Sequence, residues 1–266
     1  MAEVFTHAQP ADPGTSCRVL KENDYKSVTL TVDASGRKTI TKRYAHHKPE
    51  HLAANTRYVA DVLAFFRREF SGIATIPQCF GVDLEQFEVS IEFIPALPDA
   101  RVLNKRTFAL AAPFFERCYE IRDDRGFLRP MSGSIYYTEA MRQLIDSGFP
   151  LALGMKGDLW QNLCLANGEL ILADIDSAAL EPLGLSELIM TAEIAASFRT
   201  ENFNFQGKSA HPVCFRHLSR SQGAGLITIA LEIFDLRLTG GTALTRSIKR
   251  RVATHKLKKL LDLAYT

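Results

Sequence analysis

The sequence predicts a two-lobed α+β fold, with a small antiparallel sheet in the first lobe and a mostly helical second lobe. The early part of the chain has the order strand, strand, helix, strand, strand. Pro95 and Pro98 then interrupt the pattern, and most of the later sequence has helical periodicity. A chain of 266 residues has room for one large domain or two lobes. We expect a loose arm over 1–16, an N-lobe over 17–96 and a C-lobe over 97–266.

The first two strands form a predicted hairpin. Residues 27–32 alternate and are rich in valine and threonine, which favours a strand, and a turn signal comes after them. A second strand over 38–44 then places Lys42 on the same face as Ile40 and Tyr44, because side chains alternate along a strand.

A helix follows the hairpin and two more strands follow the helix. Pro49 is typical of a first helical turn, and the apolar side chains after it keep helical spacing. These side chains are Leu52, Val59, Leu63, Phe66 and Phe70. We expect strands over 78–82 and 87–93, and an inter-lobe linker over 96–101.

The second lobe is predicted to contain several helices and one hairpin. Residues 108–121 and 138–147 have helical patterns, and 226–238 is apolar almost all round, which predicts a central buried helix. Asn167-Gly168 lies between two short apolar runs and is a strong two-residue hairpin signal.

Composition and charge exclude several classes of protein. With 46% hydrophobic and 23% charged residues, the chain is neither disordered nor a disulfide mini-scaffold. The net charge of +2 is too small for a dedicated nucleic-acid binder. The N-terminus lacks the pattern of a signal peptide. Five widely spaced cysteines without a CxxC pair indicate free thiols in a reducing cytoplasm.

The predicted hairpin gathers polar side chains at its open end. Counting outward from Asn167-Gly168 places Asn162 opposite Ala173, so Asp174 lies beside Asn162. Asp158 lies on the loop that enters this end. Such hard oxygen ligands suit Mg²⁺ bound together with substrate phosphates. Phosphoryl transfer needs this metal and a carboxylate for the acceptor hydroxyl, while a lysine such as Lys42 can hold phosphates.

These residues resemble the motifs of the protein-kinase-like superfamily, in its atypical bacterial branch of aminoglycoside phosphotransferases, fructosamine kinases and lipopolysaccharide-core sugar kinases. Gly157-Asp158-Leu159-Trp160 with Asn162 resembles the catalytic loop, and Asp174-Ile175-Asp176 resembles the metal motif. Thr39-Ile40-Thr41-Lys42 stands where the phosphate-binding lysine strand is expected. Ile91-Glu92-Phe93-Ile94-Pro95 resembles the hinge that holds adenine.

The resemblance implies an ATP- and Mg²⁺-dependent kinase of the cytoplasm. It implies that Asp158 positions or deprotonates the acceptor hydroxyl and that Asn162 and Asp174 bind the metal. Lys42, or alternatively Lys38, would hold phosphates. The remaining implied nucleotide contacts are an acid that supports Lys42, either Asp61 or Glu50, and the hinge residues Glu92 and Ile94.

Three features depart from the family pattern. Lys156 replaces the usual histidine, and the spacing from Asp158 to Asn162 is one residue shorter than usual. Residues 21–26 form the expected turn before Lys42, where the family has a glycine-rich loop. We expect the shortened loop to be tight, with Leu159 anchored in the core, and Lys156 to pair with Asp174 when metal is absent.

The acceptor is open among three classes. A sugar hydroxyl, for example on lipopolysaccharide core or another lipid-linked sugar, is favoured by the Gly-Asp-Leu-Trp loop and the lack of an Ala-Pro-Glu motif after Asp174. The alternatives are a protein Ser/Thr kinase and a nucleotide-binding pseudokinase.

The C-terminal run over 246–261 is a basic helix with an apolar side. It is either a solvated last helix or a contact with the anionic inner face of the cytoplasmic membrane. No nucleic-acid partner is expected.

Overall fold

The computed structural model describes residues 15–45, 48–94, 101–102, 108–121, 123, 126–131, 136–156, 159, 162–197, 212–238 and 242–266. The chain forms two compact units. The first runs to Arg68 and continues from Ile76 to Pro95, and the second contains Glu69–Thr75 together with the chain from Ala96 onward. The expected arm over 1–16 and linker over 96–101 fall largely outside the described residues.

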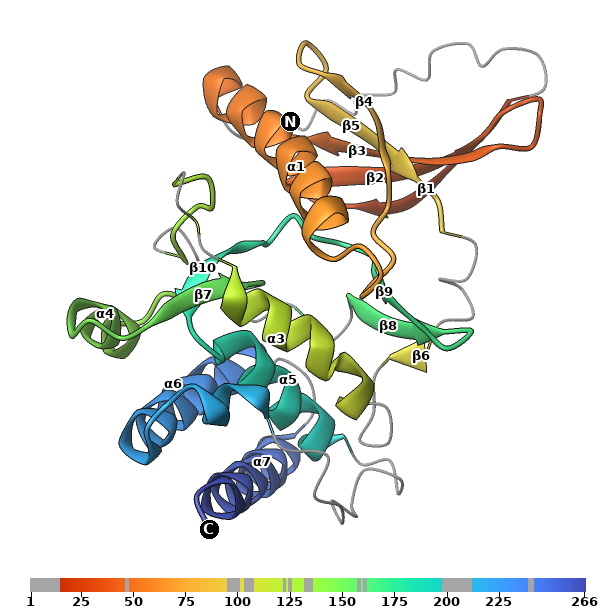
Figure 1. Ribbon diagram of the computed structural model, residues 1–266. Helices are drawn as coiled ribbons and strands as arrows, with labels where there is room; N and C mark the ends of the chain where they lie inside the picture. Colours follow the sequence, from red (N-terminus) through yellow and green to blue (C-terminus); the bar gives the residue numbers. More distant parts are fainter. Residues whose placement is uncertain are drawn as a thin grey trace. The chain divides into compact units, whose positions relative to one another are not determined.

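The first unit is an antiparallel sheet with a helix along one face (Figure 1). Its strands are β1 (Ser16–Glu22), β2 (Lys26–Val32), β3 (Lys38–Tyr44), β4 (Cys79–Asp83) and β5 (Glu88–Glu92), in the spatial order β1-β2-β3-β5-β4. The helix is α1 (Pro49–Glu69). This is the small antiparallel-sheet lobe that the sequence predicts.

Two details at the start of this unit differ from the sequence prediction. Ser16 already begins β1, a strand that we did not predict, because all its residues are exposed and show no alternation. The turn expected over 21–26 is shorter, since β1 continues to Glu22 and β2 begins at Lys26. Asn23 closes it: its side-chain oxygen accepts hydrogen bonds from the N–H groups of Tyr25 and Lys26, at 3.0 and 2.9 Å.

The helix α1 has the buried stripe that its periodicity predicts. The five apolar side chains of the predicted stripe are all buried, four of them within α1 and Phe70 just after it. Phe70 belongs to the second unit, where its ring lies 4.7 Å from that of Phe114. Thr75 follows and exchanges hydrogen bonds with Leu170 and Leu172, so this short segment extends a sheet of the second unit.

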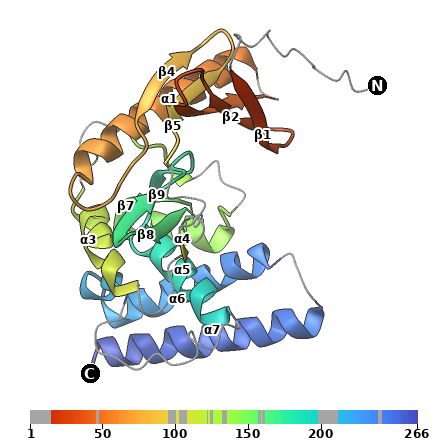
Figure 2. The same cartoon turned by 90° about the vertical axis from the view of Figure 1, so that its right-hand side faces the viewer.

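The second unit is mostly helical, with two small sheets (Figure 2). The helices are α3 (Ala112–Glu120), α4 (Glu139–Asp146), α5 (Leu185–Ala196), α6 (Arg220–Arg237) and α7 (Ala243–Ala264). Short 3₁₀ turns, η2 (Ala109–Ala111) and η5 (Val213–Arg216), precede α3 and α6. One sheet pairs β7 (Leu151–Gly154) with β10 (Ala179–Pro182), and the other has the order β6-β8-β9, from Arg101–Val102, Leu163–Ala166 and Glu169–Leu172. Among the described helices, none combines the length and apolar character needed to span a bilayer.

The most deeply buried helix is α5, which we did not predict as a separate element. All its residues except Glu193 are buried, and it packs against both α6 and α7. The helix predicted to be central, over 226–238, corresponds to the second part of α6, which ends at Arg237 and keeps an exposed side that includes Leu236. The predicted buried helix is therefore confirmed for most of its residues, whereas α5 is the more completely buried of the two helices.

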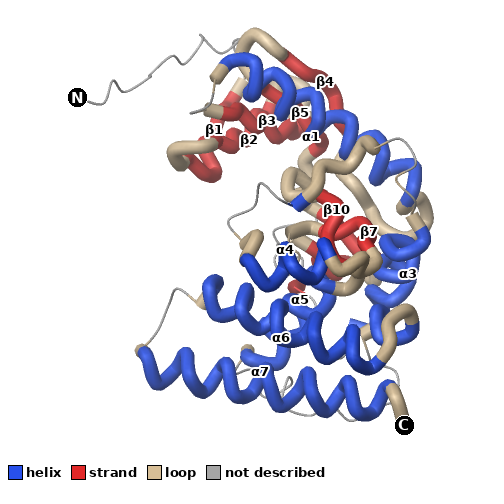
Figure 3. Tube along the Cα trace, turned by 90° about the vertical axis from the view of Figure 1, so that its left-hand side faces the viewer, coloured by secondary structure: helices blue, strands red, loops and turns tan. Residues whose placement is uncertain are grey.

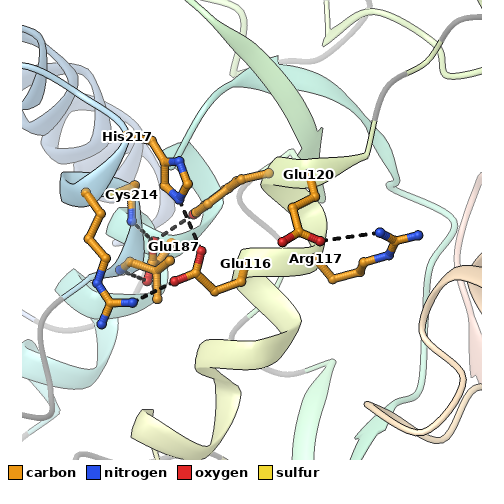
Figure 4. Close-up of polar contacts among 9 residues, drawn as sticks. Glu116, Arg117, Glu120, Glu187, Cys214 and His217 are labelled. Atoms are coloured by element: carbon orange, nitrogen blue, oxygen red, sulfur yellow. Dashed lines mark hydrogen bonds and ion pairs between the residues drawn. The ribbon is translucent and has the colours of Figure 1, made fainter.

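A buried carboxylate ties α5 to its neighbours (Figure 4). Glu187 is 1% exposed and accepts hydrogen bonds from the Tyr119 hydroxyl at 2.7 Å and from the N–H groups of Val213 and Cys214 at 2.6 and 2.9 Å. Burial raises the pKa of the Glu187 carboxyl, and these hydrogen bonds act in the opposite direction. One side chain thus joins α3, α5 and η5.

Candidate active site

The candidate phosphate-binding lysine lies on the central strand of the first unit. Lys42 pairs with Val28 of β2 and Val89 of β5, and directly paired residues share a face of the sheet. Val89 is fully buried and Lys42 is only 6% exposed. The face predicted for Lys42, shared with Ile40 and Tyr44, is therefore the covered one. Lys38, the alternative, is exposed and lies over the Phe93 ring.

The two acids expected to support Lys42 lie on α1, outside its buried stripe. Asp61 and Glu50 are both exposed, whereas the buried stripe of the helix consists of other residues. Their exposed carboxylates are poorly placed to pair with the buried ammonium group of Lys42. The identity of the acid that supports Lys42 stays a prediction.

The hinge segment begins in β5. The Glu92 carboxylate accepts a hydrogen bond from the N–H of Gln78 at 3.1 Å and lies 3.9 Å from Arg67, so this side chain stabilises its own unit. The backbone N–H of Glu92 also donates a hydrogen bond, at 2.8 Å, to the Gln78 carbonyl, so of its backbone groups only the carbonyl remains for the predicted contact with adenine. Ile94 is buried, and Pro95 lies outside the described residues.

The hairpin of the second unit has the register that Asn167-Gly168 predicts. Ala166 pairs with Glu169 and Leu163 with Leu172, and both turn residues have positive φ, as a type I′ turn requires. The ladder continues one pair further, because the Asn162 carbonyl accepts a hydrogen bond from the Ala173 N–H at 2.8 Å. The hairpin therefore brings Asn162 and Asp174 to one end, as expected.

The shortened loop before Asn162 ends in a tight turn. The carbonyl of Leu159 accepts hydrogen bonds from the N–H groups of both Asn162 and Leu163, at 3.1 and 3.0 Å. The Leu159 side chain is buried, which confirms that it anchors this loop in the core. Asp158 lies outside the described residues, so its convergence with Asn162 and Asp174 stays a prediction.

Asp174 begins the second part of the candidate metal motif. It is half-buried, and its Oδ1 accepts a hydrogen bond from the N–H of Asp176 at 3.2 Å. This bond holds the carboxylate against its own turn. Ile175 between the two aspartates is buried and fixes the turn to the core. The amide of Asn162 and the carboxylate of Asp174 offer hard oxygen donors that fit Mg²⁺.

The chain enters the candidate catalytic loop through a charged cluster that we did not predict. Lys156 has a positive φ of 48° and is half-buried. Burial lowers its pKa; the charge of Arg129 acts in the same direction and that of Glu181 in the opposite one. Arg129 and Glu181 are thus the charged residues that influence the Lys156 ammonium group. The expected pairing of Lys156 with Asp174 stays a prediction.

Glu181 and Ser186 hold the strand that leads into this loop. Glu181 is buried, and its Oε1 accepts a hydrogen bond from the Ser186 N–H at 2.7 Å. The hydroxyl of Ser186 in turn accepts one from the N–H of Met155 at 3.0 Å. Gly154 lies so close that a Cβ there would be 2.0 Å from the Glu181 Cδ. The sequence analysis missed this cluster; the one local hint was a glutamate within the apolar stretch 178–185, which does not by itself indicate a partner.

Comparison with known proteins identifies the fold. No protein-family model matches the chain, and no curated protein matches its sequence. Among solved structures, an amicoumacin kinase in complex with AMP-PNP and Ca²⁺ has a TM-score of 0.56 and 11% identity, over 92% of this chain and 88% of that one. An ADP-bound aminoglycoside phosphotransferase, APH(2'')-Ib, has a TM-score of 0.53 and 13% identity, over 93% and 92%.

A choline/ethanolamine kinase family protein from Mesorhizobium loti is also similar, with a TM-score of 0.50 and 10% identity over 94% of this chain and 92% of that one. All three are named as kinases or phosphotransferases. The chain therefore has the protein-kinase-like fold. The solved structures with this fold include an aminoglycoside phosphotransferase, from the branch that the sequence motifs resemble.

Proposed function

We propose that the chain is an ATP-dependent phosphotransferase that phosphorylates a hydroxyl of a small molecule, most specifically a sugar. The observation that carries this proposal is the β8–β9 hairpin, whose register sets Asn162 beside Asp174 in a chain with a kinase-like fold. Two of the similar structures hold AMP-PNP or ADP, which supports an adenine nucleotide as the phosphate donor.

Each residue of the proposed site has one role. Asn162 and Asp174 would hold Mg²⁺, which gathers charge on the transferred phosphoryl group when it is bound. Lys42 would hold the α- and β-phosphates, and the β5 end at Glu92 and Ile94 would meet adenine through backbone groups. Asp158 would orient the acceptor hydroxyl and accept its proton.

The metal role is tested by Asp174→Ala in a nucleotide-turnover assay. We expect turnover to fall by about a hundredfold or more, which is the scale of losing one electrostatic contact to the transition state. The matched control is Glu169→Ala, which removes an exposed carboxylate at the closed end of the same hairpin. Thermal unfolding of both variants shows whether the fold is kept. Full turnover in a folded Asp174→Ala protein would disprove the metal assignment.

The acceptor is identified by transfer from labelled ATP. The panel contains aminoglycosides, choline, lipopolysaccharide glycan extracts and protein mixtures. We expect label on a sugar, including a lipid-linked one. Label on protein would identify a Ser/Thr kinase instead, and nucleotide binding without any transfer would identify a pseudokinase, for which the shortened loop before Asn162 would be the cause.

We also propose a cytoplasmic location. All five cysteines are free, and three of them, Cys118, Cys164 and Cys214, are buried, which agrees with a reducing compartment. Fractionation of cells that express the full chain tests this proposal, and recovery in an oxidising compartment would contradict it.

A further inference from the structure

The last helix carries a large excess of positive charge. α7 contains seven lysines and arginines but a single acidic residue, Asp262, whereas the whole chain has a net charge of only +2. The rest of the chain is therefore net acidic. A charge separation of this kind indicates an anionic partner for the basic element.

One side of α7 is used for packing. Ala253, Leu257, Leu260 and Leu261 are buried, and α7 contacts both α5 and α6. The approach to α6 is close, since a Cβ on Gly223 would be 2.8 Å from Leu261 Cδ1. Figures 2 and 3 show α7 as the outermost of these three helices, so its other side faces away from them.

That other side combines two apolar residues, one histidine and three lysines or arginines. We call it the outer face of α7, and its residues follow one another at helical spacing: Leu244, Ile248, Arg251, His255, Lys258 and Lys259. Leu244 is 70% exposed and Ile248 41% exposed, and Leu236, at the end of α6, is 56% exposed. The exposed apolar residues thus lie toward the α6–α7 connection, and the cations follow along the helix.

The acidic residues described next to the outer face are already paired with other cations. Asp262, which ends this face, is paired with Arg220 at 2.7 Å, and Asp235 is paired with Arg250 at 3.0 Å. Among the residues that the structure describes, none forms an ion pair with Arg251, Lys258 or Lys259. Their charge is therefore available to an external anionic surface.

We propose that the outer face of α7 docks on an anionic lipid bilayer. The cations would lie at the level of the lipid phosphates, while Leu244 and Ile248 enter the boundary between headgroups and acyl chains. The exposed apolar residues favour lipid over nucleic acid, because phosphate contacts alone need no apolar side chain. The proposal is independent of phosphotransfer, and it would bring the site to acceptors held at a membrane.

The proposal is tested by co-sedimentation of the full chain with vesicles. Phosphatidylcholine vesicles are compared with vesicles containing about one third phosphatidylglycerol, at low and high salt. We expect binding to the anionic vesicles only, with a loss as salt rises. Each cation near such a surface raises partitioning about fivefold, so R251Q/K258Q/K259Q should reduce binding about a hundredfold.

Two further variants separate the alternatives. L244Q/I248Q should also weaken vesicle binding, whereas R18Q/K48Q/R57Q, which removes three exposed cations of the first unit, should leave it unchanged. Equal binding to both kinds of vesicle, or equal losses in the control, would overturn the proposal. If the chain binds a short single-stranded RNA more strongly than the vesicles, and L244Q/I248Q does not change that binding, the face would be assigned to nucleic acid instead.

A failure of this proposal is distinguishable from a failure of the proposed activity. Nucleotide turnover in solution should be the same in R251Q/K258Q/K259Q as in the parent chain, and Asp174→Ala should bind anionic vesicles as the parent does. A membrane-binding defect in Asp174→Ala would contradict the separation of the two sites.

Discussion

Gly154→Ala should destabilise the second unit, because the new methyl group has no room. Gly154 is the last residue of β7, and a Cβ there would lie 2.0 Å from Cδ and 2.1 Å from Oε1 of Glu181. Both distances are far below a van der Waals contact. The Glu181 side chain is buried and therefore cannot simply move into water.

The size of the loss depends on the hydrogen bond that the carboxylate must give up. Its Oε1 accepts the hydrogen bond from the Ser186 N–H at 2.7 Å, and displacement would leave that buried N–H without its acceptor. An unsatisfied buried donor costs about 1–3 kcal/mol, and overpacking costs about 1–3 kcal/mol. We expect Gly154→Ala to lower the free energy of unfolding by about 2–6 kcal/mol, with a fall in Tm of about 2–4 °C for each kcal/mol.

A double-mutant cycle with Glu181→Ala isolates the clash. In the Glu181→Ala background the methyl group has room, so Gly154→Ala should cost less than about 1 kcal/mol. Gly225→Ala is the matched control, because a Cβ there meets nothing within 4 Å and the residue lies within α6. It should stabilise the chain by about 0.5–1 kcal/mol. Equal costs of Gly154→Ala in both backgrounds would refute the reasoning.

Two substitutions and one labelling experiment test the packing of the second unit and the state of the thiols. Glu187→Gln should lower the free energy of unfolding by about 2–3 kcal/mol in urea titrations, because an amide –NH₂ would then face donors that now meet a carboxylate; an unchanged midpoint would argue against an ionised Glu187. Cys17 is exposed and should react first with a maleimide at about pH 8, as followed by mass spectrometry, whereas burial raises the pKa of Cys118 and Cys214 well above the ordinary thiol value and should protect both until the chain unfolds. Gly168→Ala should cost about 1–2 kcal/mol in thermal unfolding, since φ is +80° there, and a smaller loss would show that the turn can change type.

Local patterns predicted much of the fold. The hairpin register around Asn167-Gly168 was predictable because a two-residue turn leaves a single pairing for the strands. The stripe on α1 was predictable because Leu52, Val59, Leu63 and Phe66 recur at helical spacing and therefore share one side of the helix. The resemblance of short motifs then identified the kinase-like fold, which the similar structures confirm.

The two elements that we did not predict, β1 and α5, are stabilised by tertiary contacts and have no clear periodic pattern in the sequence. β1 is exposed throughout, so its strand conformation comes from pairing with β2 and not from any alternation of its own. α5 is apolar on nearly all sides, and such a segment shows no periodicity from which a helix could be inferred. α5 is buried by its contacts with α6 and α7, and these contacts cannot be read from the sequence.

The candidate site was predictable only where one local element fixes it. Asn162 and Asp174 share a hairpin, so their proximity follows from its register. The cluster around Lys156 joins β7, β10 and the segment at Arg129, which are distant in sequence, and no short motif announces it. The acids proposed for Lys42 were chosen by their distance from it in the sequence, and that distance does not take into account that Asp61 and Glu50 lie outside the buried stripe of α1.

The second unit is discontinuous in the chain, and this has a consequence for how the protein can be made. Phe70 and Thr75 leave the ribosome well before Phe114 and Ile171, the residues that they pack against or pair with. When the first unit has just been synthesised, this segment therefore lacks its packing and pairing partners until most of the second unit has been translated. A fragment that starts at residue 96 would lack both anchors and expose the edge of β9, so the two units cannot be separated at a single peptide bond without loss to the second.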